Sequence, residues 1–254
     1  MLTVTLSAKA FNNFQLAYFD NFLKFMLKGL EVEMKNCRVS PRKWVQATIS
    51  GEDEEAASHY LTQQVGICPE FLDRIRRFSA LRGYVTSLNN KELCVDIGIF
   101  SPGIIDASIP LDRLQAQLAD GRKLSPEKTA DLFSLVEYFP VNVKIHSIER
   151  EKNRVEAALS EKQLALYRDW TKSLLDRLIV MGASFNRVRR ALNMAKCNRD
   201  IIEIEKLGLL EQAIVCKLGT DAAGLIPRIG KSLWHARFSV FDPKDIMDFL
   251  GCHW

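Results

Sequence analysis

The sequence predicts an α+β protein made of several domains. The chain has 254 residues, more than a single domain usually contains, since most domains have about 100–200 residues. Hydrophobic residues make up 47% of it and charged residues 26%, the balance of an ordinary folded protein rather than of a disordered chain. The spacing of apolar residues changes from helical to alternating near residue 80 and back to helical near residue 160.

Residues 1–78 are predicted to form a split βαβ domain, of the ferredoxin-like or KH-like kind, followed by a basic connector. Stretches with strand and helix periodicity follow one another in the order β-α-β-β-α, over residues 2–7, 11–27, 31–39, 43–50 and a last helix that begins in the acidic run 52–55. Domains of this kind bind RNA in some proteins and protein partners in others, so the order selects neither function.

Residues 79–159 are predicted to form a five-stranded barrel. Short strands are expected over residues 81–88, 92–100, 104–110, 141–149 and 154–159. Between the third and fourth strands, residues 111–118 and 125–136 have helical patterns, and Ser125 and Pro126 mark the start of the second helix. Five strands with helical segments in this position form the OB arrangement.

Residues 160–254 are predicted to form a helical hairpin and a small α+β domain. Leu164, Tyr167, Leu174 and Leu178 mark one helix, and Ser184 caps a second. Strands are expected after the hairpin over residues 201–204, 213–218 and 236–241, with a short helix or turn over 220–229. This division predicts protease-sensitive joints near residues 66–78 and around Gly182.

Two parts of the barrel carry a family resemblance. Arg82-Gly83-Tyr84-Val85-Thr86-Ser87, followed by Leu93-Cys94-Val95-Asp96-Ile97-Gly98, resembles the opening strands of an S1 domain, and residues 139–145 and 153–160 resemble its last two strands. The resemblance implies single-stranded RNA binding by aromatic stacking and basic groups. The chain departs from the S1 pattern at Cys94, where a stacking aromatic is common, and at Ile109, where a histidine is common. The groups that remain for RNA contact are Arg82, Tyr84, Lys144, His146 and Arg154.

The whole chain also resembles an uncharacterised archaeal family, catalogued as domain of unknown function 2110. The resemblance lies in residues 207–211, 215–222 and 224–230. It implies an archaeal, cytoplasmic source and no established activity.

The distribution of charge adds candidates in the last domain. The net charge of +4 permits a nucleic-acid partner, and the basic excess lies in residues 160–254. The candidate RNA contacts there are Arg187 and Arg190 on a basic helix face and, beyond it, Lys217, Arg228, Lys231 and Arg237. A basic run of this kind on a helix is more often a plain solvated face, and a nucleic acid or an acidic protein partner is the alternative. Trp234, between these basic groups, is expected in the core rather than as a stacking surface.

Other signals point away from catalysis. In Gly224-Leu-Ile-Pro-Arg-Ile-Gly-Lys-Ser232, five residues separate the glycines where a P-loop needs four, and Pro227 offers no N–H to a phosphate. The six cysteines include no Cys-x-x-Cys pair, and Cys252-His253 is not expected to bind a metal. We therefore expect no cofactor, metal or catalytic residue. No apolar run reaches membrane-spanning length and no leader pattern is present, so a cytoplasmic protein is expected.

These observations predict a non-enzymatic accessory factor of the RNA machinery. It would bind RNA weakly, mainly through backbone contacts, by means of the S1-like barrel and the basic C-terminal domain, and would associate with components of the ribosome or of RNA polymerase. The alternative is a protein–protein docking module of a larger complex with no direct RNA contact. An enzyme with an unfamiliar site ranks last, because no histidine has a nucleophile or carboxylate at a recognisable catalytic spacing.

Overall fold

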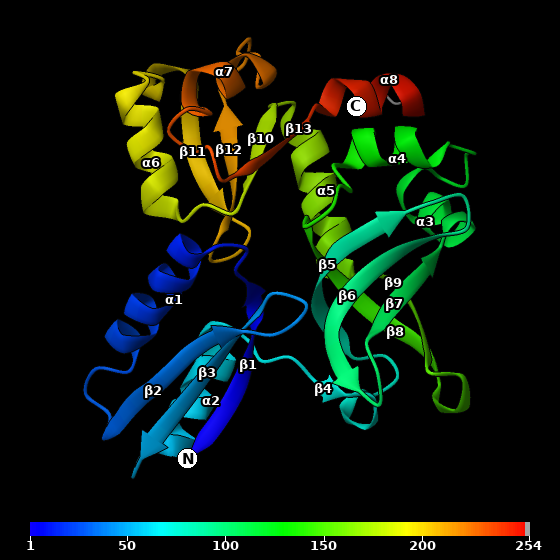
Figure 1. Ribbon diagram of the computed structural model, residues 1–254. Helices are drawn as coiled ribbons and strands as arrows, with labels where there is room; N and C mark the ends of the chain where they lie inside the picture. Colours follow the sequence, from blue (N-terminus) through cyan, green and yellow to red (C-terminus); the bar gives the residue numbers. More distant parts are fainter. Residues whose placement is uncertain (252–254) are drawn as a thin grey trace. The chain divides into compact units, whose positions relative to one another are not determined.

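A computed structural model describes residues 1–251 of the chain (Figure 1). The chain forms two compact units, residues 1–70 and residues 71 onward. None of the described helices has the length and apolar character needed to cross a membrane.

The first unit is a three-stranded antiparallel sheet with two helices. Its elements are β1 (Leu2–Lys9), α1 (Asn13–Met26), β2 (Val32–Val39), β3 (Trp44–Gly51) and α2 (Glu54–Gln64), so the predicted order β-α-β-β-α is confirmed. β3 lies between β1 and β2 and runs antiparallel to both. The side chains of Phe19 and Trp44 are fully buried in this unit.

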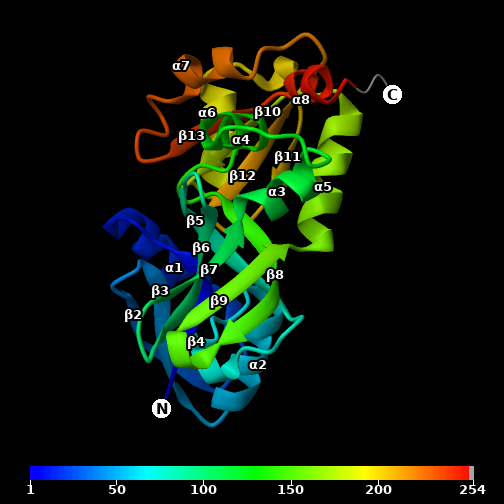
Figure 2. The ribbon, with the colours of Figure 1, turned by 90° about the vertical axis from the view of Figure 1, so that its right-hand side faces the viewer.

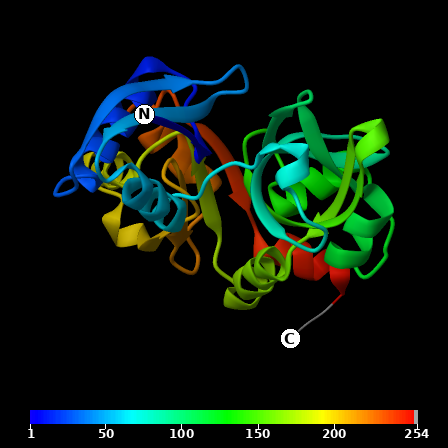
Figure 3. The ribbon, with the colours of Figure 1, turned by 90° about the horizontal axis from the view of Figure 1, so that it is seen from below.

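The second unit begins with a closed five-stranded barrel (Figure 3). After the short strand β4 (Glu70–Phe71) and a 3-10 helix (Leu72–Arg74), the barrel strands are β5 (Ala80–Leu88), β6 (Glu92–Ser101), β7 (Ile105–Pro110), β8 (Pro140–Glu149) and β9 (Arg154–Leu159). β5 pairs antiparallel with β6 and β8, β6 with β7, and β8 with β9. A parallel pairing of β7 with β9 closes the ring. The predicted OB-like barrel and its strands are thus found.

Gly83 allows the barrel to close tightly at β5. A Cβ atom at this position would collide with the Val95 side chain and the Asp96 carbonyl oxygen on β6, so only glycine permits the observed approach of the two strands. The helices α3 (Leu111–Leu118) and α4 (Pro126–Phe133) lie between β7 and β8, as expected. The Ser125 hydroxyl caps α4 by accepting a hydrogen bond from the Lys128 N–H at 3.2 Å.

A four-stranded antiparallel sheet follows the barrel (Figure 2). Its strands stand in the order β11-β12-β10-β13, and the elements from β10 to β13 follow the sequence β-α-β-β-α-β of a ferredoxin-like unit. The elements are α5 (Glu161–Ser173), β10 (Arg177–Met181), α6 (Phe185–Met194), β11 (Ile201–Lys206), β12 (Glu211–Cys216), α7 (Ile226–Ile229), β13 (Arg237–Phe241) and α8 (Pro243–Leu250). Short 3-10 helices cover Arg150–Lys152, Asn198–Asp200 and Ala223–Leu225.

The predicted helical hairpin is wrong, because the segment between its two helices is a strand. The first helix ends at Ser173, and Arg177–Met181 forms β10, whose five residues are all buried. From Leu178 to Met181 this strand is uninterruptedly apolar, because both of its faces are covered, so it lacks the alternation that would distinguish it from a buried helix. The N–H groups of Gly182 and Ala183 both donate to the Leu210 carbonyl, at 2.8 and 2.9 Å, so this point is a buried sheet end rather than an exposed joint.

The barrel and the C-terminal sheet share one hydrophobic core. The Tyr167 ring stacks on Phe241 at 6.1 Å between centroids, and the Trp170 ring meets Phe241 edge-on at 5.0 Å. The Tyr167 hydroxyl donates to the Phe133 carbonyl of α4 at 2.9 Å. The predicted boundary between residues 159 and 160 therefore lies inside one compact unit.

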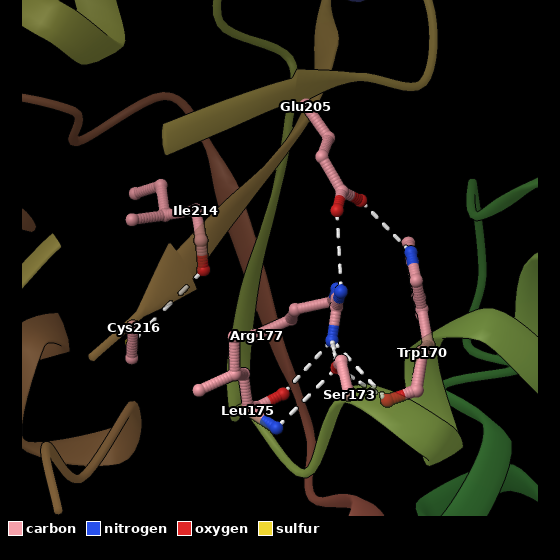
Figure 4. Close-up of polar contacts among 7 residues, drawn as sticks. All are labelled: Trp170, Ser173, Leu175, Arg177, Glu205, Ile214 and Cys216. Atoms are coloured by element: carbon pink, nitrogen blue, oxygen red, sulfur yellow. Dashed lines mark hydrogen bonds and ion pairs between the residues drawn. The ribbon is translucent and has the colours of Figure 1, made fainter. Parts of the chain in front are cut away.

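Buried and half-buried polar groups bind α5 to this sheet (Figure 4). Arg177 on β10 donates to Ser173 Oγ at 2.9 Å and to Glu205 Oε1 at 3.2 Å. The Trp170 indole N–H donates to Glu205 Oε2 at 2.8 Å. Because Glu205 accepts from both elements, the carboxylate fixes the C-terminal end of α5 against the sheet.

Candidate nucleic-acid interface

The outer face of α6 carries two arginines without acidic partners. Val188, Ala191 and Leu192 turn toward the core, and Arg187 and Arg190 lie on the exposed side. Among the described residues, neither arginine has an ion pair or a side-chain hydrogen bond. Both guanidinium groups therefore keep their charge and their donors available for an anionic ligand.

The loop of residues 230–236 lies beside this helix. Leu233 is buried and anchors the loop, with its N–H donating to the Ile229 carbonyl at 3.1 Å. Lys231 is exposed, and Trp234 is 68% exposed. The expectation that Trp234 lies in the core is wrong, because the neighbouring Leu233 takes the inward position.

The helix and the loop form one surface. Arg187, Arg190 and Met194 of α6 line a shallow hollow of about 280 Å³ together with Ser232 of the loop. The pKa of His235 is lowered by desolvation and by the positive charge of Arg187, which places these two groups within electrostatic reach. We call Arg187, Arg190, Lys231 and Trp234 the C-terminal basic surface. Exposed cations on a helix, together with an exposed cation and indole ring on the adjoining loop, are the composition of a surface that binds nucleic-acid backbone and bases.

The remaining predicted residues of this domain lie apart from that surface or are neutralised. Arg228 pairs with Asp200 at 2.9 Å, and Arg237 pairs with Glu137 at 2.7 Å. Lys217 is exposed in another hollow, where the acidic residues Asp176 and Asp221 also form part of the wall. The charges of Arg228, Lys217 and Arg237 are offset by neighbouring carboxylates, so these three residues add little to an anion-binding site.

Arg82 and Tyr84 do not form an RNA-binding face, contrary to the prediction. The Tyr84 side chain is 1% exposed, and its hydroxyl donates to Glu211 Oε1 of β12 at 3.3 Å. Arg82 forms an ion pair with Oε2 of the same carboxylate at 3.3 Å. The C-terminal sheet covers this part of β5, so the ring of Tyr84 offers no face to a base.

The barrel face that OB domains usually present, on their second and third strands, is acidic in this chain. Cys94 on β6 lies near the carboxylates of Glu92 and Asp106, and its pKa is raised by burial and by these two charges. Ile109 on β7 is fully buried in the barrel core rather than placed on that face. Carboxylates repel phosphates, so the surroundings of Cys94 lack the positive charge that RNA binding needs.

Lys144 and His146 on β8 and Arg154 on β9 are exposed, as an RNA contact requires. Phe78, which is not among the residues predicted from the sequence, lies beside Lys144 and is 58% exposed. The signal that could have identified it is the run Arg76-Arg77-Phe78 shortly before β5, which combines two cations with an aromatic ring.

No group of three potential metal ligands comes together among residues 1–251. Cys252 and His253, for which no metal role was expected, lie outside the described residues. The glycine-rich stretch before Ser232 folds into the single-turn helix α7 and the turn that follows it.

Family models match the chain in three parts. The DUF2110 N-terminal domain matches residues 3–70, the DUF2110 central domain residues 79–171, and the DUF2110 C-terminal domain residues 175–241. No curated protein is similar enough to the chain to count as a match.

Three solved structures show a distant likeness. An uncharacterised protein of Methanocaldococcus jannaschii is 10% identical, with 34% of this chain and 95% of that one covered and a TM-score of 0.25. The intact alpha subunit of aIF2 from Pyrococcus abyssi is 10% identical, with 66% and 96% covered and a TM-score of 0.27. The a/eIF2alpha–aDim2p–rRNA complex from Pyrococcus horikoshii OT3 contains a chain that is 13% identical, with 48% and 60% covered and a TM-score of 0.27. At TM-scores this low, the likeness carries no information about function.

Proposed function

The chain belongs to the DUF2110 family, and we propose that it is a cytoplasmic accessory factor of the RNA machinery that binds single-stranded RNA without catalysing a reaction. The observation that carries this proposal is the C-terminal basic surface, where Arg187 and Arg190 have no acidic partner and Trp234 is exposed on the adjoining loop. Its RNA would belong to the ribosome or to a transcript emerging from RNA polymerase.

The chemistry of this surface favours backbone contacts with modest affinity. An arginine without an intramolecular partner loses no ion pair when it binds a phosphate, so the whole attraction contributes to binding. The exposed indole of Trp234 adds stacking, which contributes about 1–3 kcal/mol per base in single-stranded complexes. Few cations and one ring predict weak, salt-sensitive binding with little sequence preference.

A protein–protein docking module remains the second candidate, because Met194 of α6 is 66% exposed and Trp234 of the adjoining loop is 68% exposed. Large apolar and aromatic side chains of this kind anchor protein interfaces. The two candidates differ in their response to salt, because phosphate contacts weaken steeply as the salt concentration rises, whereas apolar anchors keep their contribution.

The experiment is fluorescence anisotropy of a labelled single-stranded RNA with the full chain, at low and at physiological salt. The double variant R187E/R190E is expected to bind at least about tenfold more weakly, and W234A about fivefold or more. The matched control is K123E/K128E, which makes the same change in net charge at two exposed lysines near α4.

The proposal is supported if the wild type binds RNA, R187E/R190E binds it more weakly, and the control K123E/K128E binds it like the wild type. Absence of binding at low salt, or equal loss in the control, contradicts it and favours the docking module. Melting curves of all variants show whether the fold is retained, which is expected because exposed charges change stability by about 0.5 kcal/mol or less each.

A further inference from the structure

A second basic and aromatic cluster lies on the barrel, at the start of β5. The Phe78 N–H donates to the Ile145 carbonyl at 2.8 Å, and the Ile145 N–H donates to the Ser79 carbonyl at 2.9 Å. The backbone just before β5 is thereby fixed against β8. The Phe78 ring is nevertheless 58% exposed. A ring held by its backbone, with a large part of its surface in water, is a pre-organised stacking surface.

Two cations lie over this ring, and Phe78 remains 58% exposed with them in place. The Arg77 guanidinium is 4.7 Å from the ring centroid, and its Nε donates to the His146 carbonyl at 2.8 Å. Lys144 Nζ is 5.9 Å from the same centroid. Neither side chain forms an ion pair with another described residue. Phosphate oxygens that flank a base stacked on Phe78 would come within reach of both cations.

The surface around Lys144 is open, because small residues flank it on both neighbouring strands. Ala80 on β5 and Ala158 on β9 are its direct partners across the sheet. Residues paired in this way point to the same face of the sheet. A nucleotide chain can therefore approach Lys144 without meeting a long side chain from either side.

Three acidic groups of the barrel and its entry segment form ion pairs with cations outside the cluster. Glu149 pairs with Lys152 at 2.9 Å and Glu156 with Arg113 at 2.8 Å, and Asp73 pairs with Arg150 at 3.3 Å. None of these carboxylates pairs with Arg77 or Lys144, so both cations keep their charge for a ligand. This contrasts with the β6 and β7 face, where Glu92 and Asp106 make the surface acidic.

We propose that Phe78, Arg77 and Lys144 form a binding site for one nucleotide of single-stranded RNA, with the base stacked on Phe78 and the phosphates beside Lys144 and Arg77. The inference rests on the proposed function and moves the RNA contact of the barrel from the face of β6 and β7 to that of β8. Binding at this site is by stacking and charge, so it selects unpaired nucleotides rather than a base sequence.

The test compares a short oligouridylate with an abasic oligomer of the same length, by anisotropy with the full chain at low salt. F78A is expected to bind the oligouridylate about tenfold more weakly than the wild type, and F78W to keep the wild-type affinity, because the ring face is retained. F78A is expected to bind the abasic oligomer as the wild type does. K144E weakens binding of both oligomers by about fivefold or more, because it acts on phosphates.

The matched controls are F25A, at a phenylalanine that is 76% exposed in the first unit, and K123E. Both are expected to bind like the wild type. If F78A binds oligouridylate as the wild type does while R187E/R190E weakens it, the Phe78 site is wrong and the proposed function stands. If F78A loses affinity equally for both oligomers, stacking is excluded and the inference fails. If the wild type binds neither oligomer, both the proposed function and the Phe78 site are contradicted.

Discussion

The carboxylate of Glu211 on β12 lies 3.3 Å from the guanidinium of Arg82 on β5, and this ion pair joins the C-terminal sheet to the barrel. Glu211 is almost completely buried, and the Tyr84 hydroxyl donates to its second oxygen at 3.3 Å. Gly208, in the turn before β12, lies directly against both charged groups. Residues expected to contact RNA therefore determine how two elements of one compact unit fit together.

Removing the arginine is expected to destabilise the fold. In R82M the buried Glu211 carboxylate loses its cation, so the free energy of unfolding is expected to fall by about 3 kcal/mol. The double variant R82M/E211Q removes the uncompensated charge as well and is expected to regain most of that loss. Urea unfolding at neutral pH measures both values.

The control for this prediction is R237M, which breaks the exposed ion pair with Glu137. Exposed pairs contribute about 0–1 kcal/mol, so the effect is expected to be small. Equal destabilisation in R82M and R237M would show that burial of Glu211 has no energetic consequence.

A single methyl group at Gly208 is expected to disturb the same ion pair. A Cβ atom there would collide with the Glu211 carboxylate and the Arg82 guanidinium, so G208A is expected to cost about 1–3 kcal/mol of stability. G103A is the control, because a Cβ at Gly103 meets nothing within 4 Å. In a double-mutant cycle with E211A, the cost of G208A is expected to shrink. Purely additive effects would argue against a clash with this pair.

The burial of Glu211 also makes the stability of the folded protein depend on pH. Desolvation raises the pKa of its carboxyl above the ordinary value of 4.5, and Arg82 and the Tyr84 hydroxyl oppose this shift only in part. The folded state therefore holds the proton more tightly than the unfolded chain. This contribution to stability is fully present below the ordinary pKa and is lost as the pH rises through the raised pKa of the folded state.

E211Q lacks this contribution, so the stability of the wild type is expected to fall relative to that of E211Q as the pH rises. Denaturant unfolding of both proteins between about pH 4 and pH 8 measures the difference. A difference that stays constant, or that changes in favour of the wild type with rising pH, would show that the pKa of Glu211 is not raised.

The salt dependence of the RNA-binding constant measures how many phosphates the C-terminal basic surface contacts. For single strands, the slope of log K against log salt changes by about 0.7 for each phosphate contact. R187Q/R190Q is therefore expected to flatten the slope by about 1.4 if each arginine holds one phosphate. Affinities of the wild type, of R187Q/R190Q and of the control K123Q/K128Q over a series of salt concentrations give the three slopes. An unchanged slope in R187Q/R190Q would remove these arginines from the RNA contact.

Limited trypsin digestion is expected to cut the connector and spare the centre of the second unit. Arg74 and Arg76 are exposed between the boundary of the two compact units and the segment fixed against β8, whereas Arg177 is buried in β10. Mass spectrometry is expected to find early cleavage after Arg74 or Arg76 and an intact fragment that contains both the barrel and the C-terminal sheet. Early cleavage after Arg177 would contradict the shared core.

Local pattern was sufficient to predict the barrel. Residues over 154–159 alternate between the core and the surface, and the turn before them contains Asn153 with a φ of 50°, so the strand and its register are determined by nearest neighbours in the chain. The cap of α4 at Ser125 is likewise a contact across three residues. The strand β10 could not be distinguished from a helix, because burial on both faces removes the periodicity that separates the two.

Which residues of the candidate site meet solvent was decided by tertiary structure alone. Tyr84 and Arg82 have the composition of an RNA contact, but Glu211, more than 120 residues away in the chain, takes both as partners and buries the ring. Trp234 has the composition of a core residue, and it is exposed because Leu233 takes the inward position. The sequence by itself determined the fold of the barrel, since alternation acts between neighbours. The exposure of a side chain depends on which part of the chain, distant in sequence, packs over it. The spacing of residues along the chain does not contain this information.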